Sequence, residues 1–184
     1  MLTAAFVALV IVQGLAMAFD EAWFHRRRGL PRWERIGHPI DTLTVVACFA
    51  WLVAASPSAT ALGVFVALAL ASCLVITKDE WIHARCCRPG EHWLHALLFV
   101  LHPLVLGAGA AVWWRDGQAA VLGVQLVVVA VFGTYQLVYW NLVAAPTTPA
   151  GPARTRRPAD PRRRRSGSRP VRRRGRTRRV RRRR

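Results

Sequence analysis

Long apolar stretches, almost free of charge, dominate the first 145 residues of the chain. They run over Leu2–Phe19, Pro39–Ala55, Ala59–Thr77, Trp93–Trp114 and Ala119–Ala145. A helix needs on the order of 20 apolar residues to cross a bilayer, and the second and third stretches are near the lower limit. No stretch alternates with the period of two that a membrane β-barrel needs. The pattern predicts an all-α, polytopic membrane protein with five spanning helices.

The first stretch resembles a signal peptide in one respect, the small residues of Ala16-Met17-Ala18. No Lys or Arg precedes it, however, and a signal peptide begins with a positive region. We therefore expect a retained membrane helix. The alternative for all five stretches, the buried core of a soluble helical protein, fits poorly because so few charges interrupt them.

The charge of the chain divides it into two parts. Of the formal net charge of +18, residues 154–184 carry +17, from 18 arginines and one acid, whereas residues 1–153 hold nine basic and eight acidic side chains. We predict a five-helix transmembrane domain over residues 1–145 and a disordered, Arg-rich tail over residues 146–184. This distribution excludes a soluble domain that binds nucleic acid through a charged folded surface. Four cysteines are too few for a disulfide-rich module.

The loops predict the orientation. The segments Asp20–His38 and Lys78–His92 are basic, whereas Ser56-Pro57-Ser58 is uncharged and the loop after Trp114 holds only Arg115 and Asp116. Five spans place both basic segments and the tail on one side of the membrane. By the positive-inside rule that side is cytoplasmic, so we expect a multi-pass protein of the cell (cytoplasmic) membrane with its N-terminus outside.

The two basic segments share a pattern of acids and histidines. Two acid–histidine pairs with a separation of four positions begin in each segment: Glu21/His25 and Glu34/His38 in the first, Asp79/His83 and Glu91/His95 in the second, with His95 just beyond its end. Residues i and i+4 lie on one face of a helix, so each pair presents a carboxylate and an imidazole in one direction. Both segments follow helices that cross in the same direction. We therefore predict a parallel internal repeat of about residues 2–55 and 59–114, forming a four-helix bundle with a fifth helix added.

Such a bundle would gather the four pairs at its cytoplasmic end. Carboxylates and histidines that converge from facing helices hold pairs of iron or manganese ions in bundle proteins, and zinc accepts the same ligands. We predict a metal site, dinuclear and most consistent with iron or manganese, whose ligands are Glu21, His25, Glu34, His38, Asp79, His83, Glu91 and His95. The alternative is a solvated polar surface whose acids pair with the nearby arginines.

Other polar residues could support these ligands. We expect second-shell positions for Asp20, Glu80, His92 and His102, because carboxylates commonly orient ligating imidazoles. His102 lies within an apolar stretch, where it could serve the site or bond a carbonyl freed by Pro103. Pro39 directly follows His38 and predicts irregular backbone there.

The remaining polar features have plainer interpretations. Cys86-Cys87 is predicted to be an ordinary loop pair, with thiolate ligation of a metal as the lesser alternative. On the fifth helix, Gln136 and Asn141 are expected to form interhelical hydrogen bonds or to border the site. The tail is expected either to bind anionic lipid headgroups or to have no selected role. Specific binding of nucleic acid is not expected, since no aromatic or groove-reading element accompanies the arginines.

The function predicted first is a metal-dependent oxidoreductase or hydrolase that acts on a lipid-like substrate, with the metal-bound water as nucleophile or replaced by oxygen. A second hypothesis is a proton-coupled transporter in which the acid–histidine pairs relay protons; a core this small would have to form a homo-oligomer. A third is a non-catalytic membrane subunit that binds haem through two histidines. The pattern alone does not decide whether the protein is an enzyme.

Overall fold

A computed structural model describes residues 1–80, 83–84, 87–117 and 120–144, and among them every regular element is a helix. Five long helices lie in the order α1 (Leu2–Phe19), α3 (Arg32–Ala54), α4 (Ala59–Val75), α6 (Pro89–Asp116) and α7 (Ala120–Val138). Short segments extend them, namely η1 (Asp20–His25), α2 (Arg26–Arg28), η2 (Ile76–Asp79) and η3 (Tyr139–Val143). Five helices are long and apolar enough to cross a membrane, which confirms the predicted fold class. The predicted tail lies outside the described residues.

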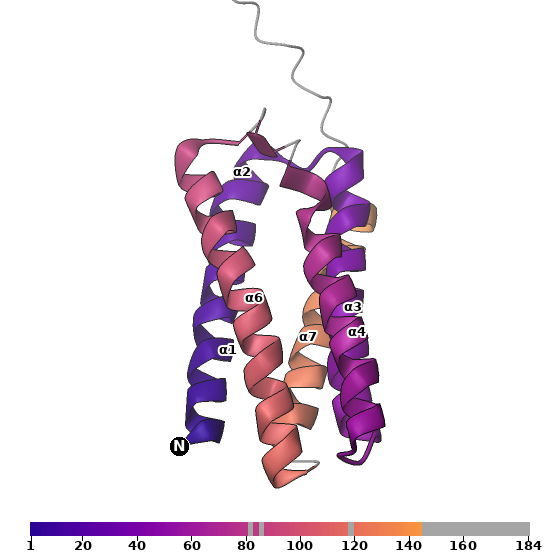
Figure 1. The fold of residues 1–184 in the computed structure, drawn as a ribbon. Coiled ribbons are helices and arrows are strands. Elements are labelled where there is room, and N and C mark those ends of the chain that lie inside the picture. The colour runs from indigo at the N-terminus through magenta and orange to yellow at the C-terminus, as the bar shows by residue number, and fades with distance from the viewer. Residues whose placement is uncertain (81–82, 85–86, 118–119, 145–184) are drawn as a thin grey trace, which may run out of the picture. The chain divides into compact units, whose positions relative to one another are not determined.

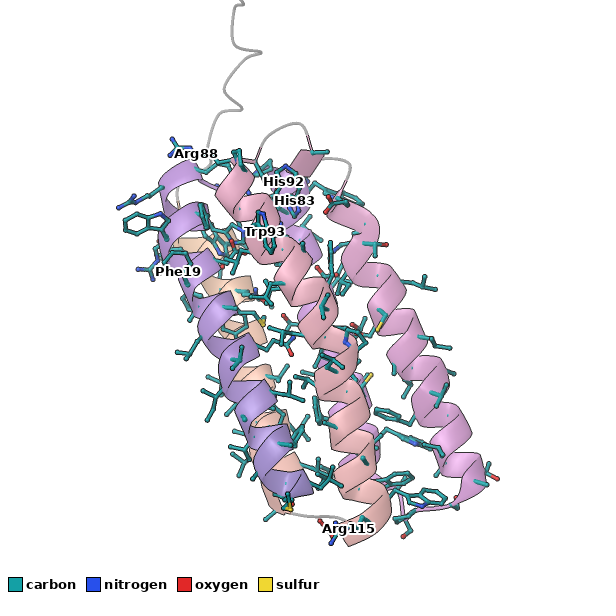
Figure 2. All side chains as sticks on the ribbon, turned by 60° about the vertical axis from the view of Figure 1, so that its left-hand side comes forward. Phe19, His83, Arg88, His92, Trp93 and Arg115 are labelled. Carbon is teal, nitrogen blue, oxygen red and sulfur yellow. The ribbon has the colours of Figure 1, made fainter. Side chains whose placement is uncertain are left out.

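The long helices pack as an open arc. The helix α1 packs against α6, α6 against α4, α4 against α3, and α3 against α7 (Figure 1). The N-terminus lies at the end of the bundle opposite α2 (Figure 1). Both acid–histidine segments lie at the α2 end, with His83, Arg88 and His92 far from Arg115 (Figure 2). The internal repeat predicted from the sequence stays a prediction.

Local sequence signals set the helix ends. Gly29, with φ of 72°, ends the first helix, because a residue with a Cβ adopts that conformation at a cost. Pro31 precedes α3 in extended conformation. The side chain of Ser58 accepts a hydrogen bond of 3.1 Å from the amide of Ala61 and so caps α4. Gly117, with φ of 69°, follows α6.

The irregular backbone predicted around Pro39 is not found. The helix α3 runs without a break from Arg32 to Ala54 with Pro39 inside it. Proline removes the hydrogen bond to the carbonyl four residues earlier, which here belongs to Arg35. The side chain of Asn141 donates to that carbonyl at 3.2 Å. A side-chain amide from η3 therefore replaces the missing helical donor, and the expected interhelical role of Asn141 is confirmed.

The interior divides into an apolar and a polar half. Toward the N-terminal end of α1, the core is built of apolar side chains such as Phe6, Phe49 and Trp113. The indoles of Trp113 and Trp51 donate to carbonyls next to the α3–α4 turn, at 2.8 and 2.9 Å. Toward the opposite end, many of the buried side chains are acids and histidines, joined by Arg35. Buried charged groups are costly unless they have partners, and within a membrane they commonly mark a functional site. The polar half is therefore the candidate location of such a site.

Candidate metal centre

A π-helical segment, η1, presents three polar side chains to the polar half of the bundle. Asp20, Glu21 and His25 are its buried residues. In a π-helix the hydrogen bond runs from i to i+5, so residues 20 and 25 come to lie on the same side. The Oδ2 atom of Asp20 is 3.2 Å from Nε2 of His25, and Oε2 of Glu21 is 3.2 Å from Nδ1 of the same ring. One imidazole thus lies between two carboxylates.

The helix α6 brings a second carboxylate–histidine pair to the same place. Glu91 and His95 lie one turn apart on its inner face and are 2% and 5% exposed. Nε2 of His95 lies 3.1 Å from Oδ2 of Asp20, so this oxygen contacts two imidazoles from two different helices. Nδ1 of His95 lies 2.8 Å from Nδ1 of His83. Because two ring nitrogens share that contact, one of them must carry the proton.

The helix α3 contributes Glu34 and His38 beside this group. The His38 ring lies edge-on to His25, with ring centres 4.8 Å apart. Arg28 binds both Glu34 oxygens, at 3.2 and 2.7 Å, and also binds Oε1 of Glu91 at 3.0 Å. One guanidinium therefore joins carboxylates from α3 and α6.

These side chains form two overlapping groups with the spacing of metal ligands. In the first, one ligand atom from each residue lies within 4.8 Å of the others, all four residues being buried: Asp20, His25, Glu91 and His95. The second group, to which the same limit applies, consists of His25, Glu34 and His38. Ligand atoms that share a metal at about 2.1 Å lie about 3.0 to 3.4 Å apart in octahedral and tetrahedral geometry. The Asp20–His25 and Asp20–His95 distances fall in this range. A buried carboxylate–histidine cluster that could hold a metal ion is therefore present.

Three polar atoms within the cluster have no hydrogen-bond partner among the described residues. They are Oδ1 of Asp20, Nε2 of His38 and Nε2 of His25, whose 3.2 Å approach to Asp20 is an ion-pair distance without hydrogen-bond geometry. Asp20 is 6% exposed and His25 is 2% exposed, so solvent does not satisfy these atoms freely. Leaving such an atom unpaired costs about 1–3 kcal/mol. Metal ligands direct such atoms at the ion and not at hydrogen-bond donors or acceptors of the protein, so these unpaired atoms fit a metal site.

The second ring nitrogen of His25, Nδ1, contacts a carboxylate that is itself hydrogen-bonded. Glu21, which contacts Nδ1 of His25, accepts hydrogen bonds from the indole of Trp140 and from the hydroxyl of Tyr135, the latter at 3.3 Å. Both donors come from the last helical segment of the described chain, α7 with η3. A carboxylate that binds the far nitrogen of an imidazole fixes its tautomer and leaves the near nitrogen available to a metal.

The charges of the cluster do not balance. Four buried or nearly buried carboxylates lie near two guanidinium groups, namely Asp20, Glu21, Glu34 and Glu91 with Arg28 and Arg35. Arg35 donates to backbone carbonyls, including that of Leu30 at 2.8 Å. Two negative charges remain for protonated imidazoles or for a cation to neutralise. A single divalent cation supplies that charge.

Seven of the eight predicted ligands have described side chains. Six of these seven lie close together: Glu21, His25, Glu34, His38, Glu91 and His95. A seventh, His83, contacts His95, and its Nε2 is 3.8 Å from Glu34. The eighth, Asp79, ends η2, and its side chain lies outside the described part of the structure. The roles predicted for Asp20 and Glu21 are exchanged. Asp20, expected to support a ligand, contacts two imidazoles, whereas Glu21, expected to be a ligand, contacts the far nitrogen of His25.

The other supporting residues lie away from the cluster. His92 and Glu80 approach each other at 3.9 Å with 32% and 48% of their side chains exposed, as a surface pair. His102 is buried farther along α6 and hydrogen-bonds Ser72 at 3.0 Å, rather than a carbonyl freed by Pro103, and it lines the same cavity as the cluster residues. Burial and the nearby carboxylate of Glu91 raise the pKa of the Cys87 thiol above its usual value. Without a bound metal the thiol stays protonated, and Cys87 belongs to neither group of close ligand atoms.

A cavity of about 280 Å³ extends from the cluster into the apolar interior. Asp20, His25 and His95 line one end, and the rest of its wall is mostly apolar, with residues such as Met17, Val105 and Phe132. Gln136 also lines it and accepts a hydrogen bond of 2.6 Å from Thr42, so this glutamine fulfils both expectations made for it. The cluster is therefore reached through a space suited to an apolar molecule.

Comparison with protein-family models, curated proteins and solved structures finds no match to this chain.

Several residues of the site were not anticipated from the sequence. From the sequence, Arg28 indicates membrane orientation and, in the polar-surface alternative, a partner for nearby acids, but not the joining of two carboxylates. The sequence does not predict that Trp140 and Tyr135 border the site. The run Arg26-Arg27-Arg28 directly after an acid–histidine segment is the one sequence signal that could have indicated a cationic partner for the carboxylates.

Proposed function

We propose that this membrane protein holds a catalytic divalent metal ion through Asp20, His25, Glu91 and His95. The observation that carries the proposal is that Oδ2 of Asp20 lies 3.2 Å from Nε2 of His25 and 3.1 Å from Nε2 of His95. Two imidazoles and a carboxylate with open positions are typical of non-haem iron sites. Glu91 adds an oxygen ligand, which suits iron or manganese.

The surroundings of these four residues support a metal rather than an ordinary ion-pair network. The Glu21 carboxylate holds His25 in the orientation a ligand needs, and Trp140 and Tyr135 hold Glu21 in turn. Arg28 fixes Glu91. One divalent cation would also neutralise the charge that the two arginines leave uncompensated.

A dinuclear site would need the second group of ligand atoms, from His25, Glu34 and His38. Glu34 and His38 could receive a second ion, but that ion would share His25 with the first. It would also displace Arg28 from Glu34, to which the guanidinium donates two hydrogen bonds. We therefore propose one tightly bound ion at the first group, and a second only where Arg28 moves aside.

The reaction we propose is oxidation of a lipid-like substrate. The cavity next to Asp20 and His95 is mostly apolar, and the helices around it are of membrane-spanning length. An iron ion would supply binding and activation of oxygen. The overall change would insert one atom of O₂ into a C–H bond and reduce the other to water, with two electrons from a separate donor and two protons. The chain's own residues position the substrate and exclude water from the cluster.

The cluster end of the bundle is proposed to face the cytoplasm, where reductants for such a reaction are available. The arginines at this end support that orientation, among them Arg26, Arg28 and Arg88. Labelling of single-cysteine variants at Glu80 and Thr3 in sealed vesicles tests it. The reverse pattern of accessibility would overturn the orientation without affecting the metal site.

The test of the proposed reaction uses the full chain in nanodiscs made from the lipids of its expression host. The protein receives ferrous iron, a two-electron reductant and oxygen, and the lipids are analysed by mass spectrometry. A lipid that gains one oxygen atom supports oxidation, and its formation must fail in Asp20→Asn while persisting in Glu80→Gln. Cleaved lipid products that form without oxygen would replace oxidation by hydrolysis. A metal-loaded protein that changes no lipid in either way contradicts the proposed reaction.

A further inference from the structure

The arc of helices leaves one seam, between α1 and α7. The helix α1 packs against α6, whereas α7 packs against α3, at the two ends of the arc. A second hollow, of about 400 Å³, lies along this seam, and its lining comes from the two helices alone. On α1 it reaches from Phe6 to Leu15, and on α7 from Val121 to Val128.

This hollow adjoins the cavity that leads to the cluster. Four residues line both spaces, and they belong to the two helices of the seam: Val10, Gly14, Gln125 and Val128. A Cβ atom placed on Gly14 would meet no atom within 4 Å. Gly14 therefore leaves open space on α1 where the outer hollow adjoins the inner cavity.

We propose that the seam between α1 and α7 is a lateral entrance through which a long hydrocarbon chain passes from the bilayer to the cluster. This inference rests on the proposed function, since it names the class of substrate and its route. The chain lies along α1, with its reacting end beside Asp20 and its remainder in the outer hollow. From Phe6 to Asp20 the helix rises about 21 Å, at 1.5 Å per residue, which gives the length of chain the path holds.

Three features favour a hydrocarbon chain over other occupants. The lining of the outer hollow is apolar except for Gln125. Both helices belong to membrane-spanning segments, where acyl and prenyl chains are the molecules at hand. The seam is closed at its cluster end, because Arg26 donates to the hydroxyl of Tyr135 at 3.2 Å and lies over the ring of Tyr139. Entry is thereby directed to the part of the seam within the bilayer.

The test is photolabelling of the full chain in nanodiscs with palmitic acid that carries a diazirine on its chain. Val105 and Leu106 report entry, because both line the inner cavity and are only 3% and 2% exposed. The blocking variant is Gly14→Phe, which fills the open space common to the two hollows. The matched control is Gly63→Phe on α4, where a Cβ also meets no atom within 4 Å but which lines neither hollow. Bound metal is measured in the same samples.

We expect the wild-type chain and Gly63→Phe to be labelled at Val105 or Leu106, and Gly14→Phe to lose this labelling while it keeps its metal. Unchanged interior labelling in Gly14→Phe, or labelling only on outer surfaces in all three proteins, would overturn the entrance and leave the metal site standing. The same holds if a second copy of the chain is found cross-linked across the seam. Absence of bound metal in the wild-type chain, with interior labelling intact, would instead refute the proposed function and keep the entrance.

Discussion

Asp20 and His25 are five residues apart, and the π-helical turn between them brings Oδ2 of Asp20 to 3.2 Å from Nε2 of His25. In an α-helix the neighbour of His25 would be Glu21 alone, at i+4. The π-helical turn puts both acids against the same ring, one at each nitrogen. This gives the two carboxylates different chemistry: Asp20 can share a metal with His25, and Glu21 can orient the ring.

The division of labour between the two acids predicts unequal effects of their substitution. Asp20→Asn should abolish tight metal binding, since it removes the oxygen that lies between two imidazoles. Glu21→Gln should weaken it by about 10–100-fold, the usual effect of losing a partner behind a ligating histidine. Metal titration of the purified variants measures this, with the exposed Glu80→Gln as control. Equal losses in Asp20→Asn and Glu21→Gln would contradict the assignment.

Arg28 should stabilise the protein most when no metal is bound. Arg28→Met leaves the carboxylates of Glu34 and Glu91 without their shared cation. Because its side chain is 22% exposed, we expect a loss of roughly 2–3 kcal/mol, below that of a fully buried pair. Unfolding in detergent, with and without divalent metal, measures the difference, and added metal should recover part of the loss. Arg27→Met, on an exposed neighbour that lies over Trp23, is the control.

The replacement of a helical hydrogen bond by Asn141 is also testable. Asn141→Leu removes the donor to the carbonyl of Arg35 and should cost about 1 kcal/mol of unfolding free energy. The double variant Pro39→Ala with Asn141→Leu should recover most of this, because alanine restores the backbone donor. A double variant no more stable than Asn141→Leu would show that Asn141 does not compensate for Pro39.

Close packing of α7 against α3 predicts a sharp contrast between two glycines of α7. A Cβ on Gly133 would lie 2.9 Å from Cγ2 of Thr42, whereas one on Gly123 would meet nothing within 4 Å. Gly133→Ala should therefore destabilise the protein by about 1–3 kcal/mol. Gly123→Ala should instead be neutral or stabilise it by up to about 1 kcal/mol through helix propensity. Thermal unfolding of both variants decides the matter, and equal stabilities would contradict the packing.

The fold could be predicted from the sequence because its determinants are local. Apolar runs of membrane-spanning length predict five helices, and the break at Gly29-Leu30-Pro31 is visible as a turn signal. Pro39 misled the prediction because the compensating donor, Asn141, is about a hundred residues away in the chain. Tertiary contacts of this kind leave no local signal.

The site was predictable in its composition and less so in its roles. The four-residue spacing of acids and histidines indicates His25, Glu34 and His95 as neighbours of a cluster, and they do lie together. The same spacing assumes regular α-helix, so it cannot distinguish Asp20 from Glu21 where the backbone becomes π-helical. The bridging position of Arg28 depends on three segments meeting, which spacing along the chain does not encode.

The most direct test of the metal centre is the metal content of the full chain, purified after growth with iron and manganese and analysed by elemental mass spectrometry. We predict one equivalent of iron or manganese in the wild-type protein, with loss in both Asp20→Asn and His95→Ala and retention in the exposed control His92→Ala. Two equivalents in the wild type would establish the dinuclear form. A folded wild-type protein that takes up no divalent metal, even on titration, would contradict the account.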